Sequence, residues 1–149
     1  MASFSDRFIV KTSIDKVWDF YTDIKHLEVI TPKDMKLIII NTTSDRIIQG
    51  QEIWISAKIF TRTRTWHSKI TFLKLYEYTD EMITGPFKRW IHLHKFYSID
   101  GKRTQIINEI DFRLPYGILG RLLEVYVYNQ IKKIFEHRKL TTIRVLESY

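Results

Sequence analysis

The sequence predicts an α+β fold, in which a curved antiparallel sheet of about six or seven strands wraps around one long C-terminal helix. Two observations lead to this prediction. The middle of the chain alternates apolar and polar residues with a period of two, whereas residues 117–146 have the period of an amphipathic helix. A helix of this kind must bury its apolar side, and the concave face of a curved sheet is the surface available to it.

The N-terminal part predicts one strand and two short helices. Residues 4–11 have strand character, and Ser13 is placed to cap a helix that carries Val17, Trp18 and Tyr21 at helical spacing. A second helix is expected over residues 25–30. It should end before Pro32, because the residue preceding a proline avoids the helical region.

The remaining chain predicts strands followed by the long helix. The strands are expected at residues 35–42, 51–60, 63–76, 81–84, 88–99 and 103–114. The apolar stripe expected to pack on the sheet comprises Leu119, Leu123, Tyr126, Val127, Ile131 and Ile134.

Length and composition limit the possible classes of protein. A chain of 149 residues is typical of one domain, so we expect a single domain over residues 1–149. The absence of cysteine excludes disulfides and thiolate metal sites and favours a reducing compartment. No window has the run of apolar residues that a membrane span needs, so a cytoplasmic protein is expected.

The net charge of +7 raises the question of an anionic partner. Its densest basic group, Arg62, Arg64, Lys69 and Lys74, lies around a predicted hairpin. No helix-turn-helix, zinc-finger or RNA-binding signature accompanies this charge, so no nucleic-acid partner is expected.

The most informative stretch is the strand that follows Gly85-Pro86. Trp90, His92, His94 and Phe96 occupy alternate positions, so their side chains share one face. Two aromatic rings and two imidazoles on one wall suit an aromatic or polyunsaturated guest. Trp66, Ile70 and Phe72 alternate on another strand and are expected on the same concave side.

Three roles are open for His92 and His94. A metal site would need a third ligand, and the candidates His67, Glu109 and Asp111 have no recognisable metal-binding spacing, so no metal and no cofactor is predicted. General acid–base chemistry is the second role, since an imidazole titrates near neutrality. The third is a hydrogen-bonded cavity wall that orients a ligand, and this is the interpretation we adopt.

The register of the last hairpin decides which residues lie near the two histidines. A two-residue turn at Asp100-Gly101 would pair His92 with Glu109 and Trp90 with Asp111. A bulged turn would instead pair His92 with Asn108, His94 with Ile106 and Trp90 with Ile110. We predict the bulged turn, because it turns the more apolar face of the last strand inward.

These elements and several motifs resemble the START-like, or SRPBCC, superfamily, and within it the polyketide cyclase/dehydrase-like proteins of prokaryotes. The matching segments are residues 17–23, 30–32, 85–87 and 114–117, together with Trp66, Trp90, His92, His94, Phe96 and residues 134–138. The resemblance implies a helix-grip fold with an internal ligand cavity. Asn108 stands where relatives carry an aspartate, which weakens any mechanism that needs a carboxylate there.

The predicted function is the binding of a small hydrophobic ligand, aromatic or isoprenoid, for carriage or sequestration. The alternative is a cyclase or dehydratase that uses His92 and His94. The predicted ligand-binding residues are Trp66, Phe72, Trp90, His92, His94, Phe96, Asn108, Ile110, Phe112, Tyr126 and Gln130. Arg138 could meet an acidic group of the ligand. A weak homodimer could form through an outward apolar patch of Ile91, Leu93 and Ile107.

Overall fold

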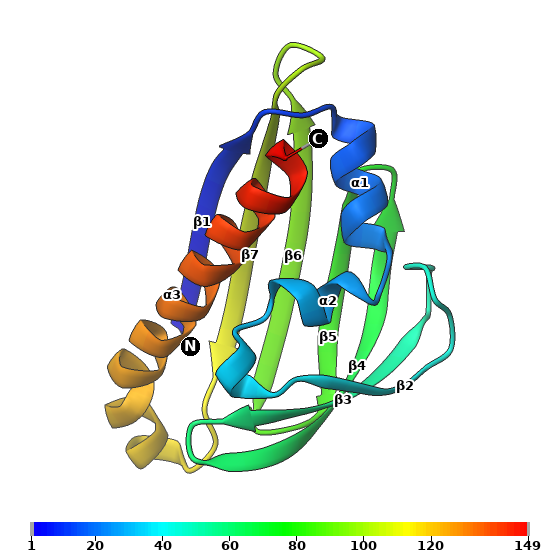
Figure 1. The fold of residues 1–149 in the computed structure, drawn as a ribbon. Helices are drawn as coiled ribbons and strands as arrows, with labels where there is room; N and C mark the ends of the chain where they lie inside the picture. Colours follow the sequence, from blue (N-terminus) through cyan, green and yellow to red (C-terminus); the bar gives the residue numbers. More distant parts are fainter. Residues whose placement is uncertain (1, 149) are drawn as a thin grey trace.

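The computed structural model describes residues 2–148 and consists of one curved antiparallel sheet whose concave face holds the helices (Figure 1). The strand order is β1-β7-β6-β5-β4-β3-β2, so the N-terminal strand pairs with the last one. The long helix α3 lies across the concave face on the β1 side, and α1 and α2 lie towards the other strands. This arrangement confirms the predicted fold class.

The elements follow the predicted order. Their bounds are β1 Ala2–Val10, α1 Ile14–Thr22, α2 His26–Ile30, the 3₁₀ helix η1 Lys33–Met35, β2 Ile38–Thr42, β3 Glu52–Ile59, β4 Arg62–Lys74, β5 Glu77–Thr84, β6 Arg89–Ser98, β7 Thr104–Arg113 and α3 Gly117–Glu147. Ser13 caps α1 as predicted, because its Oγ accepts the backbone N–H of Lys16 at 3.4 Å. None of the helices between residues 2 and 148 carries an apolar stretch that could span a membrane.

The largest difference from the prediction is the start of β5, which begins at Glu77 rather than at residue 81. The chain turns at Leu75-Tyr76, a pair without glycine, proline or asparagine, so the sequence offered no turn signal. Tyr76 takes a positive φ of 66°. Its hydroxyl donates to the carboxylate of Asp15 and its ring packs edge-on against Trp18, and both contacts hold the turn.

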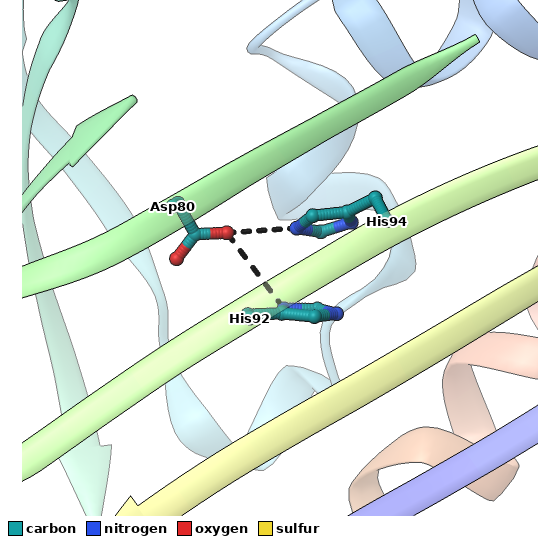
Figure 2. A group of neighbouring side chains, drawn as sticks. All are labelled: Asp80, His92 and His94. Carbon is teal, nitrogen blue, oxygen red and sulfur yellow. Dashed lines mark hydrogen bonds and ion pairs between the residues drawn. The ribbon is translucent and has the colours of Figure 1, made fainter. Parts of the chain in front are cut away.

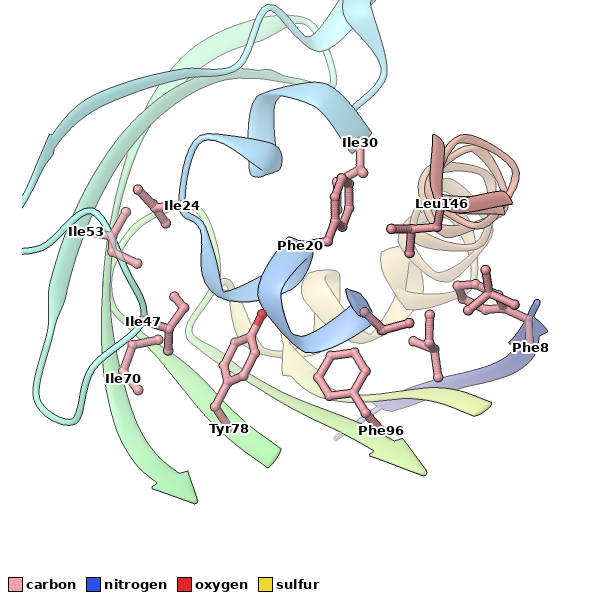
Figure 3. Close-up of a cluster of buried hydrophobic side chains, with 13 residues drawn as sticks. Phe8, Phe20, Ile24, Ile30, Ile47, Ile53, Ile70, Tyr78, Phe96 and Leu146 are labelled. Atoms are coloured by element: carbon pink, nitrogen blue, oxygen red, sulfur yellow. The ribbon is translucent and has the colours of Figure 1, made fainter. Parts of the chain in front are cut away.

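The buried apolar residues form two clusters on the concave face. The first packs around α1 and the C-terminal end of α3 and includes Phe20, Tyr78, Phe96 and Leu146 (Figure 3). The second lies beneath the middle of α3 and includes Phe4, Phe112, Val127, Ile131 and Phe135.

The apolar stripe predicted for α3 is wrong in its first half. Leu119, Leu123 and Tyr126 are 58%, 44% and 55% exposed. The buried line runs instead through Gly120, Val127, Ile131, Phe135, Thr142 and Leu146. Gly120 is the only residue between 117 and 126 that is buried, so the apolar side chains around that glycine stay in contact with solvent.

Gly120 allows α3 to begin close to the end of the sheet. A Cβ at this position would collide with the carbonyl oxygen of Pro115 and press on the Leu114 side chain. The tight approach follows from the positive φ of Tyr116 and Gly117, 73° and 54°, which turn the chain directly into the helix.

We therefore expect Gly120→Ala to destabilise the protein, although alanine in a helix interior is normally favoured over glycine by about 0.5–1 kcal/mol. The collision should lower the free energy of unfolding by about 1–3 kcal/mol, as measured by urea denaturation. Asn129→Ala, at an exposed position of the same helix, is the control. An increase in stability for Gly120→Ala would show that α3 does not pack against residues 114–115.

Candidate ligand cavity

A cavity of about 560 Å³ lies between the concave face of the sheet, the α2–η1 segment and the middle of α3. Its walls are mainly apolar. Ile53, Ile55 and Ala57 of β3 face Val127 and Ile131 of α3 across it. A volume of this size is within the range of about 300–1,000 Å³ that is typical of small-molecule sites.

One end of the cavity is a corner of three aromatic rings. The rings of Trp66 and Trp90 meet at 90° with centroids 5.1 Å apart, and Phe87 lies 5.5 Å from Trp66 and 4.9 Å from Trp90. All three residues line the cavity. Faces and edges at this angle offer an aromatic guest both stacking and edge-to-face contacts.

A polar cluster interrupts the apolar wall where β5 and β6 lie side by side (Figure 2). Asp80 Oδ2 lies 2.7 Å from Nε2 of His94 and 3.7 Å from Nδ1 of His92. Both imidazoles are buried, and all three residues line the cavity. We refer to Asp80, His92 and His94 as the polar cluster.

A hydrogen-bond chain behind the wall fixes the orientation of His92. Asn108 Nδ2 donates to Asp6 Oδ1 at 3.0 Å, which leaves Asn108 Oδ1 to accept from His92 Nε2 at 2.8 Å. His92 thus has the neutral hydrogen-bond partner that was predicted, Asn108. Because Nε2 of the neutral ring carries the proton, the Nδ1 lone pair of His92 points towards Asp80.

Ring stacking holds the cluster in place. The rings of His92 and His94 stack with centroids 3.6 Å apart, and Tyr78 stacks on the other face of His94 at 4.1 Å. Phe135 of α3 packs edge-on against His92 at 5.4 Å. The imidazoles are therefore fixed by their neighbours.

Burial controls the charge of the cluster. It lowers the pKa of His92 and His94 well below the usual histidine range, and the cationic Arg138 lowers both further, as His94 does for His92. Burial also raises the pKa of Asp80, against the opposing effects of His92 and Arg138. At neutral pH both imidazoles are consequently uncharged.

Arg138 brings a positive charge to the cavity from α3. Its guanidinium carbon lies 4.8 Å from the centroid of the Phe135 ring. No carboxylate among residues 2–148 forms an ion pair with it. The guanidinium is therefore available to an anionic group of a guest.

The predicted site residues fall into three groups. Trp66, Trp90, His92, His94 and Gln130 line the cavity. Phe96, Asn108, Ile110 and Phe112 are buried on the same face of the sheet but do not line the cavity. Tyr126 is exposed beside Phe60, and Phe72 is 43% exposed.

The expectation that Phe72 shares the concave face with Trp66 and Ile70 is wrong because of a bulge in β4. Ile70 pairs with Asp80, yet Phe72 pairs with Thr79, so one residue of β4 is left over between them. The alternation reverses at this bulge. Phe72 turns outward, and Leu73 turns inward to pair with Tyr78.

Both predicted registers of the last hairpin are also wrong. Trp90 pairs with Phe112, His92 with Ile110 and His94 with Asn108, so the bulged register is displaced by two residues. Side chains stabilise a longer loop: Asp100 accepts from the Lys102 N–H at 3.1 Å and from Arg103 Nε at 2.9 Å. A shift of two residues leaves Asn108 on the same face of the sheet as His92, diagonally across from it. The two side chains can therefore still form their hydrogen bond.

Sequence reasoning missed Asp80. Its signal was alternation with Tyr78 on a strand beside β6, but this was hidden because the turn at Leu75-Tyr76 has no turn residues. The three metal-ligand candidates named from sequence lie elsewhere. His67 stacks on Trp54 and binds Glu52 at 3.0 Å, and Glu109 and Asp111 are exposed opposite Leu93 and Ile91.

The outward patch is smaller than expected. Ile91 and Leu93 are half-buried, and Ile107 is only 8% exposed, because neighbouring strands cover it on both sides. A homodimer through these residues stays a prediction.

Solved structures show the same fold over almost the whole chain. The protein TTHA0849 of Thermus thermophilus superposes with a TM-score of 0.79 at 14% identity, covering 99% of this chain and 98% of that one. A START superfamily protein of Mycobacterium smegmatis superposes with a TM-score of 0.77 at 11% identity, covering 98% of this chain and 97% of that one. The Zhui aromatase/cyclase of Streptomyces sp. R1128 superposes with a TM-score of 0.69 at 16% identity, covering 97% of this chain and 90% of that one.

The chain therefore has the helix-grip fold of these structures, one of which is a START superfamily protein and another an aromatase/cyclase. At identities this low the likeness concerns the fold. No protein-family model and no curated protein matches the chain by sequence.

The hydrogen-bond chain behind the cavity makes a testable prediction. Asn108→Leu keeps the number and branching of the side-chain heavy atoms but leaves the His92 Nε2–H and the Asp6 carboxylate without their partner. Because unsatisfied buried polar groups are costly, the free energy of unfolding should fall by about 1–3 kcal/mol in urea denaturation. An unchanged stability would contradict the hydrogen-bond chain.

Asp6→Asn is the matched control, because an asparagine there can still accept from Asn108. Burial raises the pKa of the Asp6 carboxyl, so its ionised form destabilises the fold at neutral pH. The variant should be at least as stable as the wild type at pH 7. The difference in the free energy of unfolding between the variant and the wild type should shrink as the pH falls towards about 4, where aspartate takes up its proton.

Proposed function

We infer that this protein binds a small hydrophobic molecule, aromatic or isoprenoid, inside the cavity and carries or sequesters it. The observation that supports this function most directly is the cavity of about 560 Å³ with its three-ring aromatic corner and the polar cluster on a mainly apolar wall. Sites of this composition take most of their affinity from apolar burial and their specificity from a few polar groups.

The placement of the polar groups suggests the shape of the guest. Its apolar body would lie against Trp66, Phe87 and Trp90, and a polar end would meet His92, His94 or Gln130. Arg138 favours a guest with an acidic group, because its guanidinium has no ion-pair partner among the described residues.

Identification of a co-purifying molecule tests the proposal directly. Native mass spectrometry of the purified protein should show a bound mass that organic extraction releases as an apolar compound. A protein that carries no such mass and binds no aromatic probe at micromolar concentration would overturn the proposal.

We predict that Ser68→Trp narrows the cavity, because Ser68 lies on its wall and an indole is much larger than a hydroxymethyl group. The affinity for the neutral fluorescent probe N-phenyl-1-naphthylamine should fall roughly tenfold or more, equivalent to about 1.4 kcal/mol. Thr65→Trp is the matched control, since Thr65 is exposed on the same strand. Equal binding by both variants would place the probe outside the cavity.

A second prediction concerns the charge of the guest. Arg138→Gln should weaken binding of 8-anilino-1-naphthalenesulfonate, an anionic relative of the neutral probe, by roughly 3- to 10-fold. Binding of the neutral probe should change little, because its rings meet the same apolar wall. Equal losses for the two probes would show that Arg138 acts through packing rather than charge.

A second candidate function is a cyclase or dehydratase reaction that uses His92 and His94 for proton transfer. The observation in its favour is the 2.7 Å contact of His94 Nε2 with the half-buried carboxylate of Asp80 on the cavity wall, which places a proton donor beside an acceptor. In that case His94→Gln should abolish conversion of the co-purified molecule and leave its binding measurable.

A further inference from the structure

We propose that Asp80, His92 and His94 form a binding site for one divalent transition-metal ion, of the zinc or ferrous type, with an open position towards the cavity. The inference does not depend on the proposed binding of a hydrophobic guest. It concerns the affinity of the polar cluster for a metal ion alone.

The three side chains present a suitable set of donor atoms. One ligand atom from each of the three residues lies within 4.8 Å of the other two. Two imidazole nitrogens and one carboxylate oxygen are the facial donor set of non-haem iron sites and of many catalytic zinc sites. Small rotations of the side chains would bring the three atoms to the corners of one coordination sphere.

The orientation of His92 matches that of a metal ligand. Metal-binding histidines usually donate their second ring N–H to an oxygen acceptor, which fixes the tautomer. His92 does so through Nε2 and Asn108, and Asn108 is itself held by Asp6. Consequently the Nδ1 lone pair of His92 faces the cluster without any metal having to impose that orientation.

The contact between His92 and Asp80 is unfavourable without a cation. The Nδ1 lone pair of His92 and Oδ2 of Asp80 are two acceptors that face each other at 3.7 Å. Burial disfavours the charge of Asp80, and among residues 2–148 no lysine or arginine pairs with it. A dication between these atoms would convert a repulsive contact into two bonds.

His94 completes the set through Nε2, which already lies 2.7 Å from Asp80 Oδ2. Its other nitrogen, Nδ1, is buried without a hydrogen-bond partner among the described residues. That nitrogen is unpaired whether Nε2 binds a carboxylate or a metal ion, so it favours neither state.

The remaining coordination positions open into the cavity, because all three residues line it. Water or an oxygen atom of a guest would fill them. The positive charge of Arg138 opposes a cation at this site, so removal of that charge should not weaken metal binding.

Cobalt(II) titration of the metal-stripped protein tests the proposal, since the visible absorption of cobalt reports its coordination. We expect one saturable cobalt ion per chain, displaced by zinc. Asp80→Asn and His92→Gln should each weaken cobalt binding at least about 100-fold. Loss of a residue that only orients a metal ligand weakens metal binding less, by about 10- to 100-fold. His67→Gln, which removes the His67–Glu52 pair on the outer face, should bind like the wild type.

Nitrogen NMR of the wild-type imidazoles gives a second measurement that needs no variant. The chain has five histidines, and zinc should shift the ring signals of His92 and His94 and leave those of the other three unchanged. Absence of saturable cobalt or zinc binding by the folded wild type would overturn the proposal. So would shifts at His67 instead of the cluster, or binding retained by both ligand variants.

Discussion

The structure depends on the difference in width between the sheet and the long helix. The sheet has seven strands, and α3 covers only part of its concave face. Phe4, Val127 and Phe135 close the contact between α3 and the β1 side of the sheet. At the other side α1 fills the space with Phe20 and its neighbours. The cavity occupies the part of the concave face between these two packed regions, where Trp66 and Asp80 line it.

The polar cluster is costly to bury, and the surrounding contacts are what make it tolerable. A buried imidazole needs a hydrogen-bond partner, and Asn108 supplies one to His92 while aromatic rings hold both imidazoles. An asparagine suits this role better than an aspartate, since it can accept from His92 and donate to Asp6 together. The hydrogen bonds that Asn108 makes therefore explain an asparagine at this position.

Much of the fold could be predicted from the sequence because hydrophobic periodicity sets it. The shared face of Trp90, His92 and His94 follows from alternation alone, and α3 follows from its helical period. Asp80 could not be placed, because it depends on a turn at Tyr76 that tertiary contacts with Asp15 and Trp18 hold. The hairpin register was equally out of reach, since side chains of Asp100 and Ser98 stabilise the longer loop.

The bulge in β4 has a consequence for how the chain can vary. Ile70 and Leu73 both face inward because one extra residue separates them from perfect alternation, and Phe72 is turned away from the cavity. Deletion of Thr71 would remove the bulge and leave Phe72 outward, because Ile70 would stay opposite Asp80 and Phe72 opposite Thr79. One residue inserted between Thr79 and Asp80 would instead give Thr71 a partner, restore the alternation and turn the Phe72 ring onto the concave face. The number of residues in β5 opposite the bulge therefore decides which side chains of β4 face the cavity side of the sheet.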